Sequence, residues 1–281
     1  MRRTPWLVLL AALAACDGLA APFAKKVAIA GRGWMPFVVA QECERRGLKA
    51  LALCNEPSKG RKYLPEGSLV EIRKGLPWRQ AIAGADALIF CSEFPVGASL
   101  PVTEEILGIC AKAARAGRVA ALHPAGTRRG GFSASNLLGA VDRARKVEDA
   151  IAGAGGAVVR VGELRGGGSE EPAPPGDGSL GKAFYDTNPD FGAALADQLF
   201  DASMRGVRVE RGDTVESSIT TAFGTFAGTT GRLGAARVLV EAATAVAPKA
   251  RPAEGVSVAA VKAKQPPTEA EWGGLLRALS A

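Results

Sequence analysis

The sequence is short of the residues that build most metal and nucleophile sites. It has one histidine, His123, and no two of its five cysteines form a Cys-x-x-Cys pair. A zinc site built on two histidines or on paired cysteines is therefore excluded, and we expect no metal. The cysteines beyond the N-terminal segment are expected to be buried free thiols: Cys43, Cys54, Cys91 and Cys110.

Tyrosine is also scarce, with only Tyr63 and Tyr185 in 281 residues. The net charge of +7 would suit a nucleic-acid partner, but the lysines and arginines are scattered, with few aromatic residues among them. We therefore expect no nucleic-acid partner. A solvated basic surface instead favours a small anionic ligand, such as a phosphorylated dinucleotide.

A targeting segment is predicted at residues 1–21. Arg2 and Arg3 precede an apolar run from Trp6 to Cys16, and small residues follow at Ala20 and Ala21. This is the order of a signal peptide, and the run is too short to span a bilayer comfortably. We expect the chain to enter the secretory pathway, with no transmembrane span after signal removal.

Two other destinations stay open beside simple secretion. Leu13-Ala14-Ala15-Cys16 resembles a bacterial lipobox, in which Cys16 would be lipidated. Ala21-Pro22-Phe23 resembles the end of the signal peptide in the bipartite presequences of algae with complex plastids. The first predicted strand follows almost at once, which leaves little room for a transit peptide.

From residue 25 to residue 281 the chain alternates short apolar runs with helical patterns, which predicts a single α/β domain. The predicted fold is a doubly wound, mostly parallel Rossmann-type sheet with helices on both faces. Strands are expected at 27–30, 48–54, 69–72, 85–91, 119–122, 157–161, 207–213 and 256–261. Helices are expected at 37–46, 78–83, 104–116, 136–154 and 230–242, with a last one after 266.

The first strand runs into two glycines and then into a helical pattern, which is the layout of a phosphate-binding turn. Read as Gly-x-Gly-x-x-Gly, the first two positions match and Pro36 stands at the third. Proline has no N–H to offer a phosphate, although it is comfortable in the first turn of a helix. The predicted cofactor-binding residues of this turn are Gly31, Arg32, Gly33, Trp34 and Met35.

The residues after the second strand predict which dinucleotide would bind. No acidic residue stands directly at its end, Asn55 and Glu56 follow Cys54, and then come Lys59 and Arg61. Positive charge there would accept the 2′-phosphate of NADP, whereas a carboxylate would reject it. NADP is therefore favoured over NAD, and the alternative is a solvated basic loop. Asn55, Lys59 and Arg61 join the predicted cofactor site, as do Cys91 and Ser92 at the end of the strand 85–91.

Later segments resemble a known family. Lys146-Val147-Glu148-Asp149-Ala150-Ile151 and the stretch 155–164 are similar to a helix-to-strand phrase of the atypical short-chain dehydrogenase/reductases, in particular the NmrA-like NAD(P)-binding group. Residues 230–242 resemble a later helix of that group, and residues 266–276 the C-terminal helix of some algal and plant members. The resemblance implies a Rossmann fold, NAD(P) binding and a substrate-side loop around 165–190, which we predict to be mobile.

The same resemblance shows where the chemistry departs from the family. In the parent family a Tyr-x-x-x-Lys pair transfers the proton during hydride transfer, and its lysine also holds the ribose of the cofactor. Lys146 matches that lysine and so joins the predicted cofactor site, but Asp142 replaces the tyrosine. His123, after the fifth predicted strand, is a candidate general acid in its place. The alternatives are an ion pair between Asp142 and Lys146 and a structural histidine.

Three functions follow. The first is an NAD(P)-binding protein that works without catalysis, as a redox sensor or an assembly factor with a protein partner at the loop 165–190. The second is an NADP-dependent oxidoreductase that reduces a small carbonyl, using Lys146 and His123. The third is a scaffold that has lost the nucleotide.

Overall fold

The computed structural model describes residues 26–31, 33–54, 69–71, 84–93, 118–128, 140–153, 155–168, 179–187, 191–215, 228–246, 252 and 254–280. The predicted targeting segment at 1–21 lies outside these residues. The helices expected at 78–83 and 104–116 also lie outside them.

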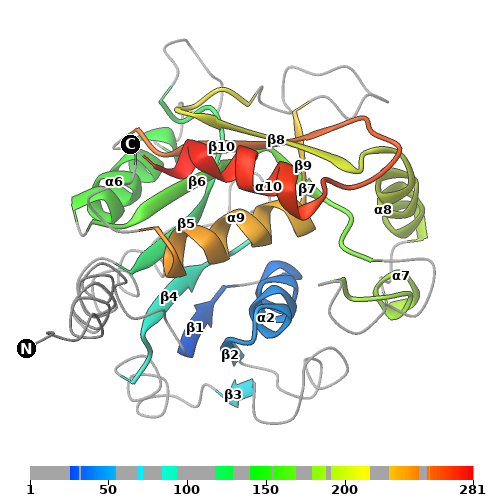
Figure 1. Ribbon diagram of the computed structural model, residues 1–281, viewed down its shortest axis with the longest axis horizontal. Helices are drawn as coiled ribbons and strands as arrows, with labels where there is room; N and C mark the ends of the chain where they lie inside the picture. Colours follow the sequence, from blue (N-terminus) through cyan, green and yellow to red (C-terminus); the bar gives the residue numbers. More distant parts are fainter. Residues whose placement is uncertain are drawn as a thin grey trace, which may run out of the picture.

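The centre of the molecule is an eight-stranded sheet in the order β3-β2-β1-β4-β5-β6-β10-β8 (Figure 1). Neighbouring strands run parallel, except that the edge strand β8 is antiparallel to β10. The predicted doubly wound, mostly parallel sheet is confirmed. The bounds are β1 Lys26–Ala30, β2 Lys49–Cys54, β3 Leu69–Glu71, β4 Ala87–Phe90, β5 Val119–Pro124, β6 Ala157–Val161, β8 Gly206–Arg211 and β10 Val256–Val261.

Helices cover both faces of this sheet. On one face α2 (Met35–Arg45) lies over β1 and β2, beside α9 (Arg232–Thr244), which crosses β4, β5 and β6 (Figure 1). On the other face α6 (Ala140–Gly153) packs on β5 and β6. Successive residues of β5 alternate between the two: Ala120 belongs to the core under α9, whereas His123 reaches Glu148 of α6.

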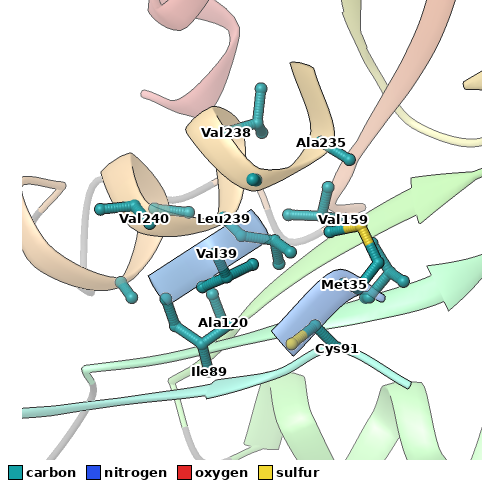
Figure 2. Packing of buried hydrophobic residues seen from close by; sticks show 14 of the residues in the cluster. Met35, Val39, Ile89, Cys91, Ala120, Val159, Ala235, Val238, Leu239 and Val240 are labelled. Carbon is teal, nitrogen blue, oxygen red and sulfur yellow. The ribbon is translucent and has the colours of Figure 1, made fainter. Parts of the chain in front are cut away.

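The main core lies between the sheet and the helices α2 and α9. Figure 2 shows Val39 and Leu239 reaching from the two helices toward Ile89, Ala120 and Val159 of the strands, all of which are buried. Because central parallel strands are covered on both faces, they appear in the sequence as continuous apolar runs. The strand predictions at 157–161 and 256–261 coincide with β6 and β10, which are mostly apolar; Arg160 and Ser257 are the polar exceptions.

Smaller elements complete the described structure. A second, two-stranded sheet pairs β7 (Glu163–Arg165) with β9 (Thr229–Gly231) in parallel. The chain ends in α10 (Glu269–Leu275), opened by a Thr268–Glu271 capping box, and the 3-10 helix η4 (Leu276–Leu279).

The region 165–190 differs from the predicted mobile loop where it is described. Residues 183–187 form the short helix α7 (Ala183–Thr187), Phe184 is fully buried, and Gly166 to Gly168 are buried as well. Helix α8 (Phe191–Ser203) follows and was not predicted. Its glycine, proline and acidic residues favour an open segment. The two described ends are instead held by contacts with residues far away in the sequence, such as that of Phe184 with Trp34.

Candidate functional site

The two glycines stand at the carboxyl end of β1, between β2 and β4, where the strand order reverses. In doubly wound sheets this switch point is where ligands bind. Gly31 lies against the main chain after β4: a Cβ there would be 2.6 Å from the carbonyl oxygen of Cys91. Gly33 has a φ of 81°, in the left-handed region that favours glycine. Both positions therefore need glycine for backbone reasons.

The helix that follows presents two amides at its N-terminus. Trp34 is the N-cap residue of α2, and its carbonyl accepts from Phe37 N and Val38 N at 3.0 and 3.2 Å. Pro36, in the first turn, has no N–H. The amides of Trp34 and Met35 are therefore the donors that the start of this helix offers to an anion.

A carboxylate of the protein itself accepts from both amides. Glu93, three residues beyond the end of β4, places its Oε1 2.9 Å from Trp34 N and 2.7 Å from Met35 N. A Cβ on Gly33 would be 2.8 Å from the Cδ of Glu93, so the acidic side chain runs directly along the glycine turn. The positive end of the helix and two converging N–H groups favour negative charge at this point.

Arg232, the first residue of α9, completes an ion pair over this turn. Its Nε lies 3.0 Å from Glu93 Oε1 and its Nη2 3.2 Å from Glu93 Oε2, which is a bidentate pair. The Arg232 side chain is 8% exposed. Its Nη1 also donates to Gly166 O at 2.7 Å and to Asp197 Oδ2 at 3.4 Å. Burial lowers the pKa of Arg232, but Glu93 and Asp197 outweigh it and raise that pKa, so the charge is kept.

Aromatic rings surround the pair. Trp34 packs edge-to-face on the buried Phe184 of α7, with 4.9 Å between ring centroids, and on Phe37 at 6.2 Å. The Arg232 guanidinium lies 5.6 Å from the centroid of the Phe184 ring. The N-terminus of α2 is thus held from the side by α7 and α9.

Asp201 of α8 orders the glycine run that follows β7. Its carboxylate accepts from the amides of Gly167 and Gly168 at 3.0 and 3.3 Å and from the Tyr185 hydroxyl at 2.7 Å. Burial raises the pKa of Asp201 to about 6, and these hydrogen bonds hold it back from a larger shift. Asp201 therefore ties α7 and α8 to the strand end that also contacts Arg232.

The structure brings together six of the predicted cofactor-binding residues. Gly31, Gly33, Trp34 and Met35 form the turn and the start of α2, and Cys91 and Ser92 follow β4 directly beside it. Cys91 is buried and its amide donates to Ala30 O at 2.9 Å. Four other predicted residues of this group, Arg32, Asn55, Lys59 and Arg61, lie outside the described part. The last, Lys146, lies exposed on α6.

His123 lies beneath α6, away from solvent. It is 1% exposed, and its Nδ1 is 3.2 Å from Glu148 Oε1. Glu148 also accepts from Thr127 at 2.7 Å and twice from the buried Arg160, at 2.8 and 2.9 Å. Among the described residues His123 Nε2 has no hydrogen-bond partner. His123 is therefore part of a buried ionic cluster with Glu148 and Arg160.

Glu148 is the centre of that cluster. Burial raises its pKa, but the hydrogen bonds from His123, Arg160 and Thr127 outweigh burial and hold the pKa well below its ordinary value. Arg128 also donates to Glu148, at 2.5 Å. The carboxylate is therefore charged and fully engaged with its neighbours.

Lys146 points to solvent from α6, two residues before Glu148. Asp142, one turn earlier, is exposed as well, and its carboxylate lies 3.7 Å from Arg145 Nη1. The predicted alternative of an ion pair between Asp142 and Lys146 is wrong, because Arg145 is the cation beside Asp142. The structure does not bring Lys146 together with His123, which is buried.

Glu93 and Arg232 were not predicted from the sequence as residues of this site. A signal existed for Glu93, because an acidic residue just beyond the strand next to β1 lies at the switch point by topology. Arg232 was seen only as part of a helix pattern. Its contact with Glu93 depends on the packing of α9 beside α2, which a local sequence pattern does not predict.

The described residues hold neither a metal-binding cluster nor a membrane-spanning helix. No group of three or more histidine, cysteine, aspartate and glutamate side chains there could hold a metal ion. None of the helices in the same residues has the length and apolar character needed to cross a bilayer. Cys43 and Cys91 are buried free thiols, as predicted, and burial raises the pKa of both.

No family model matches this sequence, and no curated protein matches it. Several solved structures are similar to this chain. A Bacillus halodurans protein provisionally named an NAD-dependent epimerase/dehydratase is 14% identical, with 86% of this chain and 96% of that chain covered and a TM-score of 0.48. A Rossmann-fold NAD(P)-binding family protein from Shigella flexneri is 13% identical, with 87% and 97% covered and a TM-score of 0.48.

A protein of Streptococcus pneumoniae TIGR4, provisionally named an NADH-flavin reductase, is 12% identical, with 85% and 100% covered and a TM-score of 0.45. The strand order of this chain, rather than these likenesses, establishes its Rossmann-type fold.

Proposed function

We propose that this protein binds a nicotinamide dinucleotide at the carboxyl ends of β1 and β4 and works through binding rather than hydride transfer. One observation carries the proposal: the amides of Trp34 and Met35 converge on a single anionic oxygen. The turn is therefore built to hold negative charge where a pyrophosphate sits in Rossmann-type proteins.

The residues fit the phosphate part of such a ligand. Gly31 and Gly33 keep Cβ atoms away from the turn, the two amides would donate to phosphate oxygens, and Arg232 would add a cation. The bound dinucleotide would supply a redox-active nicotinamide ring. We propose NADP over NAD because Lys59 and Arg61 follow the second strand; these two residues lie outside the described part, so the preference rests on the sequence.

The absence of hydride transfer is proposed from three residues. Asp142 stands where the resemblance implies a tyrosine, Lys146 is solvent-exposed, and His123 is buried against Glu148. A proton donor must come within hydrogen-bond reach of the atom that it protonates, directly or through one water. This arrangement supports a role as a redox sensor or assembly factor.

A second candidate is the scaffold that has lost the nucleotide. The position of Glu93 favours it, because the acidic side chain already uses both N-terminal amides of α2. The two candidates differ in one measurable property: whether a dinucleotide binds at all.

Titration with NADPH and NADH tests the proposal. Trp34 lies in the turn, so energy transfer from its indole to the reduced nicotinamide should rise and saturate, with NADPH binding more tightly than NADH. Trp34→Phe should remove most of the signal, whereas Trp272→Phe, a change in α10, should keep it. NADPH should remain unoxidised across a panel of small carbonyls. A folded protein that gives no saturable signal by fluorescence and no heat by calorimetry would support the scaffold instead.

A further inference from the structure

Glu93 occupies the position that the proposed ligand needs. The first turn of α2 has two outward amides, those of Trp34 and Met35, and one carboxylate oxygen of Glu93 accepts from both. The amides of Phe37 and Val38 are already used by Trp34 O, and Pro36 has none. A pyrophosphate at this helix end would therefore compete with Glu93 for the same donors.

The geometry of Gly33 supports the same conclusion from the other side of the turn. A Cβ at Gly33 would fall 2.8 to 2.9 Å from three carbons of the Glu93 side chain. In a glycine-rich turn, the missing side chain lets the phosphate approach the backbone closely. Here that space is taken by the stem of Glu93.

Arg232 holds the carboxylate in place and is itself held in place without it. Its Nε and Nη2 bind the two oxygens of Glu93, while its Nη1 bonds to Gly166 O and Asp197. The guanidinium therefore stays beside the turn when Glu93 leaves. A pyrophosphate at the turn would then meet a buried cation whose Nε and Nη2 have lost the Glu93 carboxylate, and these two donors would attract it strongly.

We infer that Glu93 is an intramolecular competitor of the dinucleotide pyrophosphate, and that Arg232 passes from the Glu93 carboxylate to the pyrophosphate when the ligand binds. This inference rests on the proposed function. In this exchange the single negative charge of Glu93, at α2 and Arg232, is replaced by the two negative charges of a pyrophosphate. The site therefore favours ligands that carry a pyrophosphate over uncharged nucleosides. The apparent affinity is lowered by the fraction of molecules in which Glu93 occupies the turn.

The test compares NADPH binding by the wild type, Glu93→Gln and Glu93→Ala, each first checked for folding by circular dichroism. Both variants should bind about tenfold more tightly, the gain expected when Glu93 covers the amides in roughly nine molecules of ten. Glu210→Gln is the matched control: it makes the same change in charge, and Glu210 pairs with Arg208 on β8 at 3.7 Å, both side chains being exposed. Its affinity should equal that of the wild type.

Two further measurements separate the parts of the inference. Inorganic pyrophosphate should raise the melting temperature of Glu93→Ala more than that of the wild type, because it probes the turn without adenosine or nicotinamide. Adding Arg232→Lys to Glu93→Ala should weaken NADPH binding several-fold, since lysine lacks the bidentate fork.

The outcomes are distinguishable. If the wild type binds NADPH and both Glu93 variants bind it equally or less tightly, Glu93 is no competitor, although the proposed function stands. If none of the three proteins binds NADPH, the proposed function is wrong and the inference falls with it. If Arg232→Lys leaves the affinity of Glu93→Ala unchanged, the transfer of Arg232 to the pyrophosphate is refuted.

Discussion

Glu93 and Glu148 each form an ion pair with a buried arginine, but the two carboxylates differ in how far they are buried and in how many groups bind them. Glu148 is 1% exposed and is held by Arg160, Thr127, Arg128 and His123. The Glu93 side chain keeps 19% of its surface exposed and depends on two amides and one arginine. If Glu148 moved away, the buried Arg160 would be left without a counter-charge, which is costly. Glu93 is partly exposed, so its carboxylate can rotate into water.

At the residue scale, Glu148→Gln should cost about 3 to 5 kcal/mol of stability at neutral pH, because it leaves Arg160 buried without its ionic partner. The pH dependence has a definite sign. Since the pKa of Glu148 is lowered on folding, its contribution is present above the unfolded value of about 4.3 and is lost as the pH falls below it. Urea titrations from pH 3 to pH 7 should show a shallower acid decline in the variant.

The control for this prediction is Asp149→Asn, the next residue on the exposed side of α6, whose carboxylate is 65% exposed. It should change stability by less than about 1 kcal/mol, as surface ion pairs do. A Glu148→Gln protein as stable as the wild type would show that the buried cluster does not hold α6 to the sheet.

The two sites also show which residues could be predicted from the sequence. The glycine turn was predictable because an apolar run, two glycines and a helical pattern follow one another in the sequence, and the left-handed φ of Gly33 is a local requirement. The contact of Gly31 with Cys91, by contrast, joins residues far apart in the sequence. The burial of His123 was implicit in the alternation along β5, since Leu122 belongs to the core under α9 and its neighbour must face α6. Arg232 was not predictable, because its partner Glu93 is 139 residues away.

At the scale of elements, the backbone of the turn after β1 is fixed by its contact with β4. A Cβ on Gly31 would fall 2.6 and 2.7 Å from the main-chain oxygen and carbon of Cys91, which a side chain cannot relieve by rotating. Gly31→Ala should therefore destabilise the protein by about 1 to 3 kcal/mol, the usual cost of forcing extra volume into a packed region. It should also weaken NADPH binding.

Gly153→Ala offers the matched comparison. Gly153 ends α6, and a Cβ there meets nothing within 4 Å. The same chemical change should be neutral or stabilising by up to about 1 kcal/mol, because alanine is the better helix former. Thermal unfolding of both variants measures the difference. Equal melting temperatures would mean that the spacing of β1 and β4 tolerates a methyl group.

Element predictions succeeded and failed for identifiable reasons. Strands such as β6 and β10 were predicted at their observed bounds because burial on both faces makes them mostly apolar, with Arg160 in β6 and Ser257 in β10 as polar exceptions. Helix α7 was missed because five residues within a stretch rich in glycine and proline carry no periodic signal. Its order comes from Phe184 packing on Trp34, a contact that spans 150 positions of the chain.

At the scale of the whole molecule, a bound dinucleotide should stabilise the native state. Because it contacts the turn only when the sheet and α9 are assembled, it binds the folded chain and not the unfolded one. NADPH at a hundred times its dissociation constant should raise the free energy of unfolding by about 2.7 kcal/mol. Urea unfolding with and without NADPH measures this. An unchanged midpoint at saturating NADPH would favour the scaffold.

The close contact between Gly31 and Cys91 also has a kinetic consequence. The main chain of the turn lies directly against the end of β4 and cannot shift in that direction. The turn therefore already has its bound shape before a ligand arrives. What must move is the Glu93 side chain, and side-chain rotations are intrinsically far faster than loop rearrangements. Little ordering entropy is then lost on association, and the rate at which the site opens is set by how long one carboxylate stays on its two amides.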